Sequence, residues 1–456
     1  MSQATSLLKR ELGTLESYAA LVGILVGAGI FRVTSDAFAL TGPSVILGYL
    51  LLAPAVLATS VAYSVFLSTS LGREPGGEYT HIARTFGPLT AFVGAWLKLV
   101  SYFGAGAFLA TVLADYLLAL FSVEPTELLR KTIAVACIAF FWFVHARGVR
   151  WFGRIQVAMC ALLGVSIVVL VVPGVFAIEL ANYRPFYRGG FAGLAAALPL
   201  LFFAFAGFES LAQTAGEVKD STRLLPVVFL KGILLTTGIF LAMSIVTFGV
   251  LPGAQLESSA TPMSDVAAVY LPFGAAAFVT LGGVMAVATS LNATMLVPAR
   301  LGVMLARDGL VPAVLGVVHA RRGTPTFGLL LTFVLTALLV VSGQVMLALM
   351  IAVLALVLLY ALHSLALLLL PRLDPELYSE ITVRIPRRVQ VAAAVLSVLS
   401  MSAIAYVLIA QDVDVLRTTS LRDRLANGDL TAIELLFLWG AAGILFYNLR
   451  PRAVAE

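Results

Sequence analysis

Two short interruptions in apolar segments of this sequence would expose backbone polar groups to a ligand. The first is Gly27-Ala28-Gly29, about halfway along the segment 21–31, and the second is Phe205-Ala206-Gly207, within the segment 198–216. In hydrocarbon every backbone amide and carbonyl needs a partner, so an unwound helix is tolerated only where it lines a cavity or is buried in protein. Two such breaks at corresponding places in two halves of a chain indicate a ligand site on a path through a membrane.

The two interruptions present backbone groups of opposite charge. The first exposes amides at the start of an outer half-helix, whose dipole favours an anion. The second exposes carbonyls at the end of an inner half-helix, which favour a cation or an ammonium group. Together they suit a zwitterion such as an α-amino acid, unless the glycines merely allow close helix packing. The expected binding residues are Gly27, Ala28, Gly29, Ile30, Phe203, Ala204, Phe205 and Ala206.

Three charged residues lie within or beside apolar segments. Glu209 follows the second interruption, where burial favours a neutral carboxyl and makes it a candidate proton carrier or gate. The alternative is a structural carboxylate that caps the exposed amides of the first helix. Lys98 lies about 13 Å into its helix; we expect it to snorkel to the cytoplasmic interface, and a gating or coupling role is the alternative. Arg32 is expected in an outer vestibule.

The composition identifies the class of protein in which these residues must be positioned. The chain has 456 residues, of which 61% are hydrophobic and 12% are charged, whereas an average soluble domain is about 25% charged. This is the composition of a polytopic membrane protein surrounded by lipid. The net charge of +5 is the surplus expected of cytoplasmic loops and implies no nucleic-acid partner. No obligatory protein partner is indicated, and residues 1–13 do not resemble a cleaved signal.

Twelve segments are long and apolar enough to cross a membrane as helices. An even number places both termini on one side, and the loops on that side hold most of the lysines and arginines, which predicts cytoplasmic termini in a cell membrane. No linker divides the chain, so one membrane domain, 1–456, is expected. The segments are 15–38, 43–70, 89–120, 129–146, 151–176, 192–216, 226–251, 273–305, 325–342, 344–370, 387–410 and 432–449.

Cysteine and histidine usage predicts no metal site and no cofactor. Cys137 and Cys160 fall in apolar segments, where free cysteines usually serve packing. The histidines are scattered without the spacing of metal ligands. They are His81, His145, His319 and His363.

Six motifs, in this order and spacing, resemble the amino acid–polyamine–organocation superfamily of secondary transporters. The resemblance covers nearly the whole chain and implies the leucine-transporter-type fold. This is an all-α fold with two inverted repeats of five helices, here 1–176 and 192–370, followed by two appended helices in 387–449. Helices 1 and 6 are discontinuous in it. The motifs are GAGIF at 27–31, PGGEY at 75–79 with FGP at 86–88, FAFAGFE at 203–209, GEVKD at 216–220, ARDGLVP at 306–312 and GTP at 323–325.

The resemblance also implies roles for individual residues. In similar transporters an aromatic residue at the position of Phe203 closes over the substrate. Proton-coupled members often place a lysine in helix 5, where this chain has Leu163. Sodium-driven relatives carry a hydroxyl pair that matches Thr289 and Ser290, although such hydroxyls often bond to their own helix. The candidate sodium site is Gly23, Val26, Ala286, Thr289 and Ser290. Proton coupling through Glu209, sodium coupling and exchange all stay open.

The function expected from these observations is secondary transport of amino acids by alternating access. Small or medium neutral amino acids are favoured, because the sequence shows no dedicated pocket of acidic side chains. An exchanger of amines or organocations and a transport-inactive receptor of the same fold are the alternatives. We do not expect an enzyme, since no nucleophile, base or metal ligands cluster in the apolar segments. A primary pump is disfavoured because the chain has no G-x-x-x-x-G-K-[ST] loop.

Overall fold

The computed structural model describes residues 10–27, 29–259, 261–427 and 430–449. These residues are almost entirely helical, and their β-structure is limited to two isolated bridges, Leu12 with Val218 and His319 with Thr324. Within this described part, nine helical stretches are long and apolar enough to cross a membrane. One of them, Thr14–Leu67, contains the first two predicted spans. The chain is therefore a multi-pass helical membrane protein.

Each predicted span falls on a helix. The long helices are α2 (Thr14–Leu25), α4 (Val45–Leu67), α6 (Pro88–Leu120), α7 (Glu127–Ala146), α8 (Val149–Gly174), α9 (Gly190–Phe205), α11 (Ser221–Val250), α14 (Phe273–Arg307), α15 (Thr326–Ser342), α16 (Val345–Leu373), α18 (Arg387–Thr418) and α20 (Ala432–Leu449). Shorter ones are a π-helical turn (Gly29–Val33), α3 (Thr34–Thr41), α5 (Glu78–Phe86), α10 (Ser210–Gln213), α12 (Gly253–Ser258), α13 (Pro262–Tyr270), α17 (Pro375–Ser379) and α19 (Leu421–Asn427).

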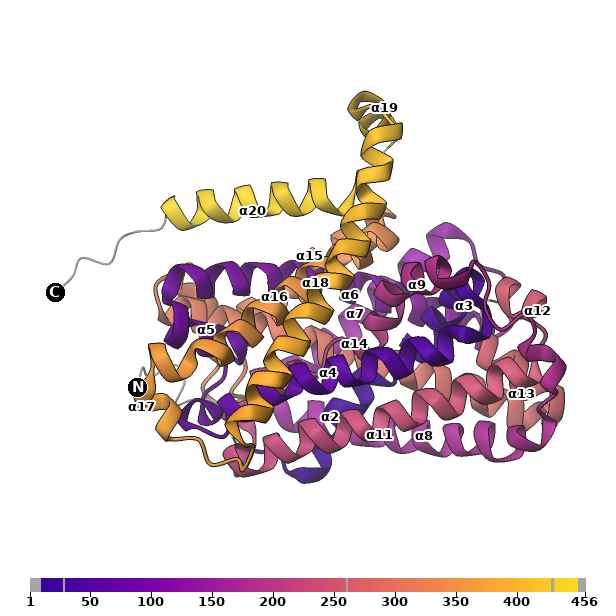
Figure 1. The fold of residues 1–456 in the computed structure, drawn as a ribbon, viewed down its shortest axis with the longest axis horizontal. Coiled ribbons are helices and arrows are strands. Elements are labelled where there is room, and N and C mark those ends of the chain that lie inside the picture. The colour runs from indigo at the N-terminus through magenta and orange to yellow at the C-terminus, as the bar shows by residue number, and fades with distance from the viewer. Residues whose placement is uncertain (1–9, 28, 260, 428–429, 450–456) are drawn as a thin grey trace.

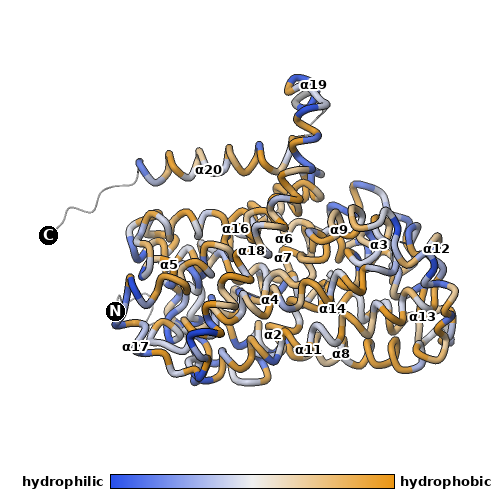
Figure 2. The backbone as a smooth tube through the Cα atoms, in the orientation of Figure 1, coloured by the Kyte–Doolittle hydropathy of each residue, from blue (hydrophilic) through white to orange (hydrophobic). Residues whose placement is uncertain are grey.

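The long helices run roughly along one axis of the molecule (Figure 1). Helices α5 and α17 lie at one end, α12 and α13 lie at the other, and α20 lies along the outside, where it packs on α6 and α16. Hydrophobic residues follow the lengths of the helices, and hydrophilic residues gather at the two ends and at α19 (Figure 2). This distribution is expected of a bundle whose middle faces hydrocarbon.

Helix α6 lies at the centre of the bundle and packs on both α14 and α16. Gly104 makes the approach to α16 close, because a Cβ atom at this position would overlap the carbonyl of Ala348. Small residues permit such contacts between membrane helices. The polar side chains of α6, Lys98 and Tyr102, consequently point into protein and are almost fully buried.

Residues of the sequence motifs connect the elements at the end of the bundle that carries α5. The Glu217 carbonyl accepts hydrogen bonds from the Glu11 and Leu12 amides, each at 3.0 Å. Its carboxylate accepts two from the Arg300 guanidinium of α14, at 3.2 Å each, and both side chains are fully buried. This ion pair joins the N-terminal stretch, the segment after α10, and α14.

The connector at 71–88 joins the same end. It forms the short helix α5, as its periodic pattern predicts, and most of the helix is buried. The Tyr79 hydroxyl donates to Asp308 at 2.5 Å, and Arg307 pairs with Glu74 at 3.1 Å. The motifs at 75–79, 216–220 and 306–312 therefore meet in space.

We expect Glu217→Gln to destabilise the fold, because it leaves the Arg300 guanidinium buried without a counter-charge. Removing one partner of a buried pair typically costs about 3–5 kcal/mol. The measurement is the melting temperature of purified protein in detergent. Glu127→Gln is the matched control, since Glu127 pairs with Lys131 on the surface. Equal melting temperatures for the two variants would contradict a stabilising role for the buried pair.

Candidate functional site

Both interrupted helices break where the glycine pattern predicts. Helix α9 ends at Phe205, Ala206 is extended, and Gly207 has a φ of +100°, after which α10 begins at Ser210. A positive φ of this size favours glycine. Helix α2 ends at Leu25, and the next described helical turn begins at Gly29. The expected binding residue Ala28 lies outside the described residues.

The two breaks lie against each other. A Cβ atom at Gly29 would overlap the backbone of Ala204 in α9. One at Gly27 would overlap the Ser290 hydroxyl of α14. Both glycines therefore allow close backbone approach, and this approach brings the first broken helix against the second and against α14.

A small cavity adjoins the breaks. Its free volume is about 30 Å³, which is room for one or two water molecules. Side chains must therefore move before an amino acid can enter. The cavity is lined by Ile24, Leu25, Gly29, Ser101, Tyr102, Ala105, Leu109, Phe203, Ala206, Gly207, Glu209, Ser290, Thr294, Ala352, Val353 and Leu356.

Phe203, which lines this cavity, contacts a residue that lines a larger one. Its ring packs edge-on against Phe108, with centroids 5.4 Å apart. Phe108 also lines a cavity of about 230 Å³, whose wall includes Arg32, Asp115 and Arg130. Arg32 lines this charged cavity, and its Nε atom lies 3.6 Å from Asp36 Oδ2. The contact between the two phenylalanines therefore links the walls of the two cavities.

Glu209 lines the inner cavity and is fully buried. Its Oε1 atom accepts a hydrogen bond from the Tyr102 hydroxyl at 2.6 Å. Its Oε2 atom accepts one from the Tyr360 hydroxyl and one from the Gly207 amide at 3.0 Å. The carboxylate therefore caps an amide of its own broken segment, not of the first helix. All of these donors are neutral groups.

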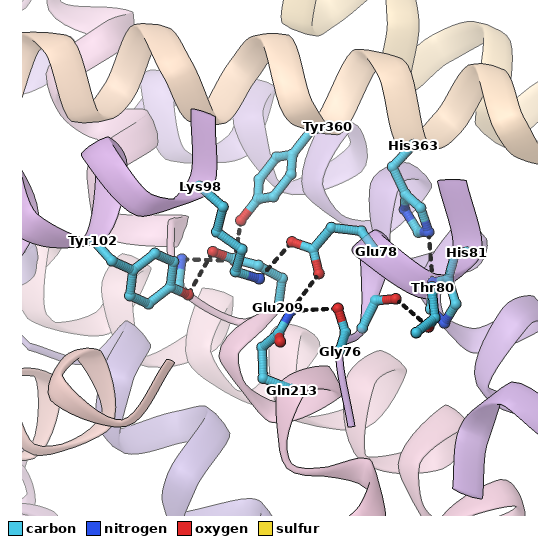
Figure 3. Close-up of polar contacts among 12 residues, drawn as sticks. Gly76, Glu78, Thr80, His81, Lys98, Tyr102, Glu209, Gln213, Tyr360 and His363 are labelled. Carbon is cyan, nitrogen blue, oxygen red and sulfur yellow. Dashed lines mark hydrogen bonds and ion pairs between the residues drawn. The ribbon is translucent and has the colours of Figure 1, made fainter. Parts of the chain in front are cut away.

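The prediction that Lys98 snorkels to the interface is wrong. Its side chain is 1% exposed, and its Nζ atom lies 2.5 Å from Glu78 Oε1 in α5. Gln213 of α10 donates to Glu78 Oε2 at 3.2 Å and to the Gly76 carbonyl at 2.8 Å (Figure 3). With a buried carboxylate beside it, the ammonium group does not need to reach water. The pair joins α5 to α6 directly beside Glu209.

Four residues of the candidate sodium site come together. The Thr289 hydroxyl donates to the carbonyls of Gly23 at 2.8 Å and Ala286 at 2.6 Å. The Ser290 hydroxyl donates to Gly23 at 3.2 Å and to Ile24 at 2.8 Å. The hydroxyls thus bond to both the first helix and their own. The carbonyl partner beyond Gly23 is Ile24, where the resemblance implied Val26.

Helix α8 contacts the place where α2 meets α14 through a side-chain amide, that of Gln156. Leu163, at the family's lysine position, is a buried core residue. Gln156 instead donates to the Ala19 carbonyl at 3.2 Å and to the Thr289 carbonyl at 3.3 Å, and accepts from Asn292 at 2.8 Å. The sequence reading missed this link, because amides within an apolar segment carry no charge signal.

The other expected binding residues lie beside the cavity without lining it. Gly27 faces Ser290, and Ala204 faces Gly29. Ile30 is fully buried, and the Phe205 ring packs against Tyr49 and Phe240. The Phe203 carbonyl, expected to be free, accepts the Ala206 amide at 3.1 Å. Of the predicted set, Gly29, Phe203, Ala206 and Glu209 line the cavity.

Several polar residues of the site were not predicted. Tyr102 follows Lys98 by four residues, so helical periodicity places both on one face and was a usable signal. Tyr360 and Gln213 gave no such signal. His81 and His363, which seemed scattered in the sequence, are hydrogen-bonded at 2.9 Å. Among the described residues, no three histidine, cysteine or acidic side chains group as metal ligands.

Comparison of the sequence with known proteins finds amino acid transporters. A family model described as "Amino acid permease" matches residues 12–420. The chain is 25% identical to the branched-chain amino acid permease BcaP of Bacillus subtilis, over 66% of this chain and 68% of that protein. It is 26% identical to the b(0,+)-type amino acid transporter 1 of Mus musculus, over 75% of this chain and 72% of that one.

A third relative is the chloroplastic cationic amino acid transporter 9 of Arabidopsis thaliana. It is 27% identical over 66% of this chain, and the match spans 56% of the relative's length, little more than half. The family model itself covers nearly the whole chain. The chain therefore belongs to the amino acid permease family, within the amino acid–polyamine–organocation superfamily of membrane transporters.

Proposed function

We propose that this chain is a secondary active transporter that moves amino acids across the cell membrane by alternating access. The observation that carries the proposal is the cavity at the two helix breaks, which is lined by Gly29, Phe203 and Ala206. Helix breaks at such depth are tolerated where they line a cavity, and in transporters such breaks mark the binding site. The relatives' names support amino acids as the substrate class.

The proposed layout has twelve crossings in one domain. The segments 1–176 and 192–370 form inverted repeats of five helices each, and 387–449 adds two more. The layout is supported by the position of the two breaks, in the first helix of each repeat. Basic residues at the end that carries α5, among them Arg73 and Arg84, support a cytoplasmic location for that end and for both termini.

Small or medium neutral amino acids are the proposed substrates. Most of the cavity wall is apolar, with Leu25, Val353 and Leu356 among its residues. Glu209 is the only carboxyl among the described residues of that wall. A small apolar space beside backbone dipoles suits a zwitterion with a short aliphatic side chain.

Glu209 also supports a second candidate, an exchanger of amines or organocations. A carboxylate held only by neutral donors attracts a cation. The Arabidopsis relative is named as a cationic amino acid transporter. A preference for ligands that lack a carboxylate would favour this candidate.

For coupling we propose a proton carried by Glu209, whose carboxyl faces the cavity where the substrate enters. The alternative is sodium at Gly23, Val26, Ala286, Thr289 and Ser290. Oxygen ligands of this kind suit a hard cation. Replacing external sodium with choline distinguishes the two: uptake that needs the proton gradient alone supports Glu209.

Counterflow in proteoliposomes tests the function directly. Unlabelled amino acids or amines are placed inside, and one labelled candidate outside. Because counterflow needs only alternating access, we expect label to accumulate for a subset of neutral amino acids whatever the coupling ion is. Accumulation with amines alone would favour the second candidate. Ligand binding without accumulation, by protein shown to be folded, would indicate a non-transporting receptor.

Gly29→Ala should reduce counterflow at least about tenfold, equivalent to about 1.4 kcal/mol. The added Cβ overlaps the Ala204 backbone and forces the two breaks apart. Gly238→Ala is the matched control, because a Cβ atom there meets no other heavy atom within 4 Å. Wild-type counterflow in Gly29→Ala would exclude the close contact of the breaks from the transport cycle.

Glu209→Gln should abolish the stimulation of uptake by an acidic exterior while counterflow persists. The amide keeps the shape of the side chain but cannot exchange a proton. Uptake of labelled substrate is measured against external pH. Glu124→Gln, at an exposed position, is the control. An unchanged pH profile in Glu209→Gln would remove this residue from coupling.

A further inference from the structure

Three ionisable side chains are buried together beside the cavity: Glu78, Lys98 and Glu209 (Figure 3). Each is at most 1% exposed. They come from α5, from α6 and from the break between α9 and α10. Buried charges need compensation from protein groups, because water cannot supply it. The charge balance of this cluster therefore constrains its protonation.

The cluster contains two carboxyl groups and one ammonium group. If all three ionise, one negative charge is left over in a dry interior. Such a charge is unfavourable, so the cluster gains by binding one more positive charge from the cavity. The contacts decide which of the two carboxyls is left without a counter-charge.

Lys98 forms its ion pair with Glu78. The ammonium lies 2.5 Å from Glu78 Oε1, and Gln213 donates to Glu78 Oε2 at 3.2 Å. Lys98 Nζ also lies 5.3 Å from the centre of the Tyr102 ring, whose hydroxyl donates to Glu209. The ammonium is thus next to Glu209 without being bonded to it.

The other titratable groups around the two carboxyls bring no fixed positive charge. They are phenols from three helices and two imidazoles, and the imidazoles are hydrogen-bonded to each other at 2.9 Å. Among the residues that the structure describes, Lys98 is therefore the single fixed cation of the cluster. The groups are Tyr63 of α4, Tyr102 of α6, Tyr360 of α16, His81 of α5 and His363 of α16.

We propose that Glu78 is a positioning residue for proton coupling: by holding Lys98, it keeps the Glu209 carboxylate free to accept the transported proton. The proposal rests on the proposed role of Glu209 and adds Glu78 and Lys98 to it. In one cycle the Glu209 carboxylate takes a proton from the cavity and becomes a neutral carboxyl, and it releases that proton on the other side. The Glu78–Lys98 pair stays ionised throughout.

Glu78→Gln tests this with Glu209 left intact. Without the Glu78 charge, the Lys98 ammonium becomes the counter-charge of Glu209 and removes its tendency to bind a proton. We expect the variant to lose the stimulation of uptake by an acidic exterior, as Glu209→Gln does. The double variant Glu78→Gln/Lys98→Met restores one excess carboxylate, so the pH dependence should return.

Lys98→Met gives an independent measurement. It leaves two carboxylates without a cation, so half-maximal stimulation of uptake should move to higher pH. Counterflow without a gradient checks that each variant is folded and active. If Glu78→Gln shows no counterflow, the pH profiles of the double variant and of Lys98→Met test the proposal instead.

A wild-type pH profile in Glu78→Gln would overturn the proposal. So would a double variant that is active in counterflow but remains insensitive to pH, because Glu78 would then carry the proton itself. An unmoved profile in Lys98→Met would also overturn it. Failure of the proposed function looks different: the wild-type protein itself would show no counterflow with any substrate.

Discussion

Backbone groups inside a membrane must find partners within the protein, and the two helix breaks meet this constraint with local hydrogen bonds: the Ala206 amide donates to the Phe203 carbonyl, and the Thr34 hydroxyl donates to the Gly29 carbonyl. Gly29 sits on the backbone of Ala204, and Gly207 turns the chain with a positive φ while its amide is capped by Glu209. Helices α6, α14 and α16 supply the rest of the cavity wall beside the breaks. The cavity is the space that this arrangement leaves beside the breaks.

Buried charge imposes a second constraint on the same region. Arg300 with Glu217, and Lys98 with Glu78, are paired ions with almost no exposure. Each pair joins the end of the bundle that carries α5 to a long helix, so the pairs fix the connector and the segment after α10 beneath the cavity. Glu209 differs from these residues because only neutral donors hold it.

The structure shows the site in a nearly closed state. The inner cavity has about 30 Å³ of free space, whereas the vestibule beyond Phe203 and Phe108 has about 230 Å³. Alternating access requires a barrier on each side of the site. In the proposed transporter, the two aromatic rings in edge-on contact are the barrier toward the vestibule, and the network around Glu78 is the barrier on the other side. The two barriers differ in kind, one apolar and one ionic.

The sequence by itself determined the membrane class, the positions of the helices and both breaks, and it drew attention to Glu209, because hydrophobic length, glycine and isolated charge are local signals. It misplaced Lys98, whose partner Glu78 lies on a connector rather than on a span, and gave no sign of Tyr360 or of the Gln156 link. These contacts depend on which sides of the helices pack together. Only the tertiary structure decided that, because side-chain partners far apart in the chain are chosen by packing rather than by local pattern.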